Sequence, residues 1–305
     1  MNKIISVLKN RNTILISAIL FGLIWGDIAH SFKQLTFYIL AAVLSFSTSG
    51  IVLSEINSKK KLFKSMSLGF ILNYLLFGIV IITSAYFLSP SKEIFWGFVI
   101  IAATPPGVAI IPFSIILGGN LKHSTLATLG GFVASIFMAP LIIKVFTGNE
   151  NMQILPLFIS MIKIIVLPMI LSRFLLLNPI KPFTEKYRGK VVNWGFATII
   201  FIAVGINRHV FLSNFDILFR VSLILFISMF VLGQVYDFIL KRLNINSEER
   251  ISQNLILTLK SSGFSVVTAL QLFNETVVIP SAVMSVFVLA YLLFLTFKQY
   301  LRRNH

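Results

Sequence analysis

Apolar runs of about 20 residues recur along the whole chain and constrain its fold more than any other feature. A helix of that length crosses a hydrocarbon core of about 30 Å. Counting such windows predicts ten spans, at approximately 13–31, 36–54, 65–87, 94–118, 123–146, 153–175, 190–208, 215–240, 250–272 and 277–297. Hydrophobic residues make up 57% of the chain and charged residues only 12%, about half the charged share of a soluble domain. We therefore expect an all-α integral membrane protein with ten transmembrane helices.

The polar residues exclude several classes of function. The net charge is +16, but the basic residues lie between apolar runs and not on one solvated face, so no nucleic acid partner is expected. The chain has no cysteine, and its four histidines lie near span ends, so we expect no disulfide, metal centre or cofactor. It also has no phosphate-loop, GxSxG or HExxH motif. We therefore do not expect an enzyme or a built-in ATPase.

Positive charge is divided unequally between the two sides of the predicted spans. Nineteen lysines and arginines fall in the N-terminus, the C-terminal tail and the loops 55–64, 119–122, 173–190 and 241–250, and only four fall on the other side. Positive loops are retained in the cytoplasm. No A-x-A-type cleavage site follows the first apolar run, so that run is expected to remain as the first helix. The expectation is a multi-pass protein of the plasma membrane with both termini cytoplasmic.

The fourth span is apolar but carries helix-breaking residues. Residues 102–120 contain three prolines, among them Pro106 and Pro112, and three glycines, among them Gly107. A broken backbone in a bilayer persists only where protein packs around it or where it lines a hydrated site. A simple proline kink is the alternative interpretation. The ninth span carries a second interruption, at Lys260-Ser-Ser-Gly-Phe-Ser265.

The two interrupted spans occupy corresponding positions in the two halves of the chain. The ten spans divide at the loop 147–152 into two sets of five, and an odd set that is repeated must enter the membrane the other way up. We therefore expect inverted repeats over 13–146 and 153–297, within a single domain 1–305. Paired interruptions in such repeats indicate a secondary carrier with a site near the bilayer midplane.

Lys260 lies about ten residues into its span, so its ammonium is expected near the bilayer centre. Charge at that depth costs about 2.5–3.5 kcal/mol on insertion scales and usually has a function. Two functions fit: a fixed cation that replaces a bound metal ion, or a lysine that exchanges protons. A lysine that merely stabilises the break is the structural alternative. Its expected solvation comes from Ser261, Ser262 and Ser265 and from the carbonyls freed around Gly263.

Five other charged residues need an explanation. Lys163 lies in the middle of the sixth span, where it either faces a cavity and pairs with an anionic substrate, or snorkels, or pairs with Asp237 or Asp27. Solvation at span ends explains those two aspartates as well as function does. Asp216 and Arg220 are spaced i, i+4, which predicts a helical salt bridge.

Three segments resemble the bile acid:sodium symporter family. They are the run Ser49-Gly-Ile-Val-Leu-Ser54 before a basic loop, the Pro105-Pro-Gly107 break followed by Gly119-Asn120, and the Ser262-Gly263 break in span nine. The resemblance implies a panel of spans one, two, six and seven beside a core of the other six. It also implies that broken spans four and nine cross in the core, and that substrate sits in the crevice between the two bodies.

The resemblance allows the family's sodium ligands to be compared with this chain. Ser124 and Thr128 keep hydroxyl oxygens, and Asn73 supplies an amide where the family has a longer one. Other ligand positions fall on Ile110, Ile111 and Ile256, which have no side-chain oxygen, and the glutamine position falls on Lys260. These departures argue against sodium coupling. We expect the Lys260 ammonium to occupy the place of a sodium ion close to Asn73, with uniport-like or proton-coupled transport.

The resulting expectation is a secondary transporter of a small organic anion that works by alternating access in the lipid bilayer. One alternative is an exporter of the auxin-efflux-carrier type, whose ten-span fold with crossing helices resembles the one expected here. A membrane sensor that uses the scaffold without transport is another. The residues expected to bind substrate or ion are Lys260, Asn73, Ser124, Thr128, Ser261, Ser262, Pro106, Gly107, Pro112 and Lys163.

Overall fold

The structure is a computed structural model that describes residues 11–50, 59–148 and 154–303. These residues form helices and short connections, with no strand among them, which confirms the expected all-helical class. Six helical stretches are long and apolar enough to cross a membrane: Leu62–Leu88, Leu121–Thr147, Leu155–Phe174, Lys181–Ile206, Phe215–Arg242 and Glu275–Leu301. The chain is therefore an integral membrane protein with several spans. Residues 51–54, at the end of the second predicted span, and 149–152 of the dividing loop lie outside the described part.

Helices in the first half of the chain follow the predicted spans with two interruptions. They are α2 (Arg11–Ile24), α3 (Gly26–Ser31), η1 (Lys33–Leu35), α4 (Thr36–Thr48), α5 (Lys59–Phe70), η2 (Ile71–Leu76), α6 (Phe77–Leu88), α7 (Lys92–Ala103), α8 (Ile110–Ile116) and α9 (Leu121–Thr147). The first predicted span is split at Trp25, between α2 and α3. The fourth is split between α7 and α8, at the prolines.

The second half of the chain also consists of α-helices, with π-helical turns and a break among them. They are α10 (Ile154–Met161), η3 (Ile162–Val166), α11 (Leu167–Phe174), α12 (Lys181–Ile206), α13 (Arg208–Ser213), α14 (Phe215–Phe226), η4 (Ile227–Val231), α15 (Leu232–Arg242), α16 (Ser247–Thr258), α17 (Ser262–Leu272) and α18 (Glu275–Arg303). α12 begins at Lys181, earlier than the predicted 190, because its first turns are polar and fall outside an apolar window. η2, η3 and η4 are π-helical turns inside longer helical stretches.

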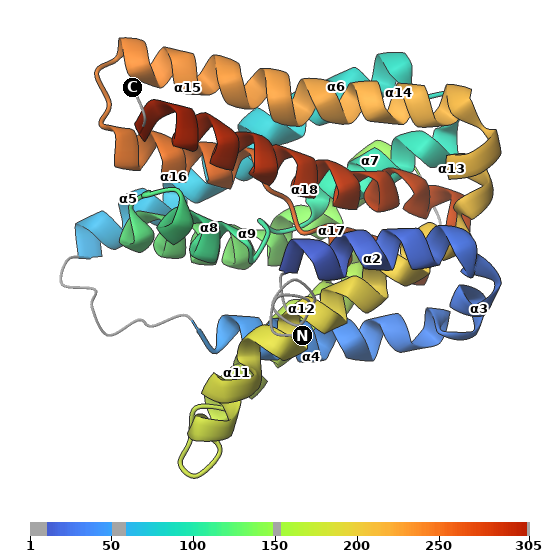
Figure 1. Cartoon of the computed structure of the whole chain (residues 1–305), viewed down its shortest axis with the longest axis horizontal. Coiled ribbons are helices and arrows are strands. Elements are labelled where there is room, and N and C mark those ends of the chain that lie inside the picture. Colours follow the sequence, from blue (N-terminus) through green and yellow to red (C-terminus); the bar gives the residue numbers. More distant parts are fainter. Residues whose placement is uncertain (1–10, 51–58, 149–153, 304–305) are drawn as a thin grey trace, which may run out of the picture.

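Two groups of helices can be distinguished by their packing. α2, α3, α4 and α11 all pack on one another or on α12. The other group includes α5 to α9 and α14 to α18, which form the larger part of the molecule. Figure 1 shows α4, α11 and α12 in the lower part of the view and α6, α14 and α15 along the top. The groups meet where α12 contacts α17 and α18, where α4 contacts α17, and where α10, which precedes α11 in the same predicted span, contacts α9.

The interior is filled mainly by aliphatic and phenylalanine side chains. Lys260 is the exception: among the described residues it is the one charged residue that is buried, with 2% of its surface exposed. Burying an unpaired charge is costly, so its surroundings must compensate for the lost water. The position of Lys260 therefore identifies the part of the structure in which a functional site is to be sought.

Candidate functional site

The first interruption separates α7 from α8. Its residues include Pro105 and Pro106, which have no backbone N–H to donate and clash with a preceding helical turn. Thr104 is extended, with φ −71° and ψ 155°, so the chain leaves the helix just before the prolines. It becomes helical again only at Ile110. Both predicted helix breaks therefore occur as real gaps and not as kinks, since α16 and α17 are likewise separate helices.

The second interruption spans Leu259 to Ser261, and it pairs with the first. Leu259 and Ser261 are extended, with φ −97° and ψ 104°, and φ −81° and ψ 92°. The N–H of Gly107 donates to the carbonyl of Leu259 at 2.8 Å, and the N–H of Ser261 donates to the carbonyl of Pro105 at 3.1 Å. These bonds make a short antiparallel bridge between Pro106 and Lys260. Each break thus satisfies backbone groups that the other leaves open.

The pairing brings the Lys260 side chain into a cage of oxygen atoms. Its Nζ donates to Oδ1 of Asn73 at 2.7 Å, to the carbonyl of Ala102 at 2.9 Å and to the carbonyl of Thr104 at 2.7 Å. An ammonium has three N–H donors, so all of them are used. Nζ also lies 4.5 Å from the ring centroid of Tyr74, a distance at which a cation is attracted by the ring. The cage therefore stabilises a buried positive charge without a carboxylate.

The cage differs from the one expected from the sequence. The serines that follow Lys260 do not bind its ammonium: Ser265 donates to the carbonyl of Ser262, and the buried Oγ of Ser261 has no partner in the described structure. Lys260 is in the extended break, so its side chain does not lie over the following helical turn. It crosses instead to the first break and to η2, which supplies Asn73.

Ser124 and Thr128 lie apart from this cage. Ser124 donates to Ser114 at 2.8 Å, Ser114 lies 3.4 Å from Ser252, and Ser252 donates to the carbonyl of Asn120 at 3.1 Å. These three hydroxyls connect α8, α9 and α16. The Oγ1 of Thr128 is buried and has no partner among the described residues.

Two neighbouring cavities, which share lining residues, lie beside the breaks. A small cavity of about 40 Å³, enough for water, is lined by Gly107, Lys260, Ser261 and Ser262. A cleft of about 610 Å³ is lined by Pro112 and other residues of α8, together with residues of α4, α12 and α18. Arg11, Val108 and Ala109 line both. The cleft therefore lies at the boundary between the two helix groups, next to the small cavity at the paired breaks.

A broken helix pair with an adjoining cleft suits a membrane carrier, and comparison with known families supports this class. Residues 36–214 match the family model described as the sodium bile acid symporter family. The chain belongs to this family. No curated protein matches the sequence. The matched part contains the first break but ends before α14. Lys260 and the second break lie outside it, and the structure alone brings them to the first break. Members of the sodium bile acid symporter family are transporters, which implies a lipid environment and a small-molecule substrate.

In this member of the sodium bile acid symporter family, Lys163 does not lie at the paired breaks or beside the two cavities. It is exposed on η3 and lines neither the small cavity nor the cleft. Asp27, an expected partner, instead binds Arg208 at 2.8 Å. Asp237, the other, lies 3.1 Å from Arg250 and 3.0 Å from Lys298. The sequence does not reveal these pairings because the partners belong to different helices.

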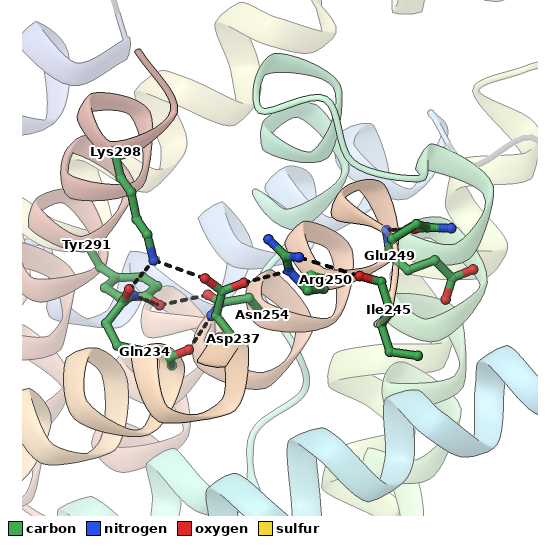
Figure 2. A network of polar contacts seen from close by, with 10 residues as sticks. Gln234, Asp237, Ile245, Glu249, Arg250, Asn254, Tyr291 and Lys298 are labelled. Atoms are coloured by element: carbon green, nitrogen blue, oxygen red, sulfur yellow. Dashed lines mark hydrogen bonds and ion pairs between the residues drawn. The ribbon is translucent and has the colours of Figure 1, made fainter. Parts of the chain in front are cut away.

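Asp237 is not solvated at the end of its span, as one interpretation of the sequence had it. Its side chain is only 13% exposed, and Figure 2 shows it between Arg250 of α16 and Lys298 of α18. Lys298 also donates to Gln234, and Asn254 joins the same network through Tyr291 at 2.7 Å. The network ties the first half of the second broken helix, α16, to α15 and α18. The i, i+4 salt bridge between Asp216 and Arg220, at 3.0 Å, is present as predicted.

Arg11 and Arg188 are charged residues of the cleft that the sequence does not single out as site residues. The sequence indicates only that they belong to the positive charges of the side expected to be cytoplasmic. They lie far apart in the sequence and reach the same cleft because α2 packs on α12. No short motif signals such an arrangement.

Proposed function

We propose that this protein is a secondary transporter of a small organic anion that works by alternating access without coupling to sodium. The observation that carries the proposal is the Lys260 ammonium held by Asn73 and two carbonyls at the paired breaks. Carriers use interrupted helices to expose carbonyls and helix ends at a midplane site. Here the carbonyls are already occupied by a cation that belongs to the chain.

Sodium coupling requires a place where several oxygens surround the ion. In this chain Ile110 and Ile256 are buried at positions that the family resemblance assigns to ligands, and they offer no side-chain oxygen. The fixed ammonium also repels a second cation over a short distance, and strongly so in a medium of low dielectric constant. Uniport-like transport follows if Lys260 stays charged, and proton coupling follows if its ammonium releases a proton during the cycle.

The same proposal includes ten spans in two inverted repeats, 13–146 and 153–297, within a single domain 1–305. Support comes from the paired breaks, one in each half, and from the two groups of helices that would serve as panel and core. The lining of the cleft includes Arg11, Arg188 and Gly189, which belong to the side with the excess of positive loops. On the opposite side Lys33 binds Glu275 at 2.9 Å. This arrangement fits a state that is open to the cytoplasm, in a plasma membrane protein with both termini cytoplasmic.

An anionic substrate is favoured by the charges around the two cavities. Neither cavity is lined by an aspartate or a glutamate among the described residues, whereas both are lined by Arg11. The small cavity also receives Ser261, the N-cap of α17, whose hydroxyl makes no cap hydrogen bond. A helix N-terminus attracts negative charge. Ser261, Ser262, Pro106 and Gly107 are thus proposed to line the inner end of the substrate path.

Purified protein in proteoliposomes tests the proposal. A thermal-shift screen of organic acids first identifies a ligand, because binding to the native state raises apparent stability. Uptake of that acid should be the same with inward gradients of sodium or of potassium at fixed pH and voltage. Uptake that rises only with the sodium gradient would contradict the proposal. Comparing uptake with and without a pH gradient then separates uniport from proton coupling.

A membrane sensor on the same scaffold is the second candidate. It is favoured by the cage of Lys260, which is complete without any ion from solution. A ligand that raises the melting temperature but is not taken up by proteoliposomes in either direction would support the sensor. Net outward movement alone would instead support the exporter.

A further inference from the structure

We propose that the large cleft binds an organic dianion, and that its two negative groups pair with Arg11 and Arg188. This inference rests on the proposed function, because it assigns the substrate class of the same transporter. It concerns the cleft of about 610 Å³ and not the cage of Lys260. That volume is in the range of small-molecule sites.

The lining of the cleft combines an apolar wall with two arginines. Ile111, Pro112, Phe113, Ile115 and Ile116 of α8 form the apolar wall. Arg11 at the start of α2 and Arg188 on α12 contribute the charges from the other helix group. A molecule in the cleft would therefore contact both hydrocarbon and guanidinium groups.

Neither guanidinium has a carboxylate partner among the described residues. Arg11 lies over the ring of Phe113, with 5.5 Å from its Cζ to the ring centroid. Arg188 donates from Nε to the hydroxyl of Ser49 at 3.1 Å, which leaves its Nη groups for another acceptor. The described aspartates and glutamates that form ion pairs do so with other lysines, arginines or His30. The cleft thus holds two positive charges that nothing described in the chain neutralises.

In alternating access, the two unpaired arginines determine how much negative charge the substrate must carry. When the helix groups close over the cleft, water leaves it, and a guanidinium without a counter-ion becomes expensive. Lys260 does not need the substrate for this purpose because its three donors are already bound. A monoanion would neutralise only one arginine. A dianion would neutralise both, and its hydrocarbon part would lie on the α8 wall.

Arginine is suited to carboxylates because its planar fork donates two parallel hydrogen bonds to one carboxylate. The ligand class that combines these requirements is a dicarboxylate with an apolar chain between its acidic groups. Sebacate is a suitable probe, and decanoate has the same chain length with one carboxylate. Decane-1,10-diol has the same chain and no charge, and adipate tests a shorter separation.

Isothermal titration of the full chain in lipid nanodiscs measures the effect. The wild-type protein should bind sebacate at least about tenfold more tightly than decanoate, and the diol should not compete. Arg11→Gln and Arg188→Gln should each reduce sebacate affinity to that of decanoate. Arg220→Gln is the matched control, because Arg220 is paired with Asp216 on α14 and should leave binding unchanged. Melting temperatures of the variants establish that they are folded.

Equal affinity for sebacate and decanoate in the wild-type protein would overturn the inference, and this comparison needs no variant. Failure of sebacate and adipate to bind at all would overturn it too. The outcome is separable from that of the proposed function. Sodium-driven uptake with a retained preference for sebacate would contradict the proposed coupling and leave the dianion site intact.

Discussion

The Nζ of Lys260 lies 2.7 Å from the Oδ1 of Asn73, which joins the second helix break to a π-helical turn of the first half of the chain. The two residues are 187 positions apart. The same ammonium binds two carbonyls at the end of α7, so one side chain links three segments. Removing it affects both the charge at the site and the backbone groups that it satisfies.

Lys260→Ala should abolish transport while the protein still inserts into the membrane. Unpaired buried acceptors cost about 1–3 kcal/mol each, so the variant should also unfold at a lower temperature. Uptake of the ligand from the thermal-shift screen and a melting curve are the two measurements. Lys163→Ala is the matched control: it removes a lysine from the middle of another span, but that lysine is exposed and outside both cavities. Unchanged uptake kinetics in Lys260→Ala would reject a functional role for the cage.

Gly131 allows the first break to pack against α9. A Cβ at this position would lie 2.5 Å from Cγ and 2.6 Å from Cδ of Pro106, which is closer than real Cβ atoms come. Gly131→Ala should therefore displace the break and lower stability by about 1–3 kcal/mol, as overpacking does. Gly78→Ala, in α6, is the control because nothing lies within 4 Å of its new Cβ. The control should be neutral or slightly stabilising, since alanine favours a helix. Thermal unfolding of both variants in the same detergent provides the comparison, and equal melting temperatures would contradict the account.

Asp237 lies between two cations and should matter more than an exposed aspartate. Asp237→Asn leaves Arg250 and Lys298 without the charge that they share, and removing one partner of a buried pair costs about 3 kcal/mol or more. Asp216→Asn breaks an exposed helical pair, which is worth less than about 1 kcal/mol. The two unfolding temperatures should differ accordingly. A loss no larger for Asp237→Asn than for Asp216→Asn would mean that the network in Figure 2 does not stabilise α16.

The two helix breaks could be predicted from local chemistry. The partners of the Lys260 ammonium between them could be predicted only in part. Prolines and glycines end a helix wherever they occur, so the gap between α7 and α8 follows from residues 102–120 alone. The proximity of Lys260 to Asn73 was expected from the family resemblance. The sequence also predicts the serines after Lys260 as partners of its ammonium. They proved wrong because the lysine stands in extended backbone and its side chain reaches another segment.

Asp237 and Lys163 show the same limit for charged residues. Both lie in apolar helical stretches, and the sequence leaves open whether each is solvated or has a function. Asp237 is enclosed by cations of α16 and α18, whereas Lys163 is on an exposed surface. Which direction a side chain takes depends on the rotation of its helix within the packed group. That rotation is set by contacts between helices and not by local composition.

The sequence by itself determined that this protein is helical, lies in a membrane and interrupts two of its helices, because these properties depend on hydropathy and on backbone chemistry within a short window. Only the tertiary structure decided which groups meet. It paired the two breaks, enclosed Lys260 with the oxygens of Asn73, Ala102 and Thr104, and brought Arg11 and Arg188 to one cleft. The reason is physical: a buried charge must be satisfied by whichever polar groups the packing of distant helices brings within hydrogen-bonding distance.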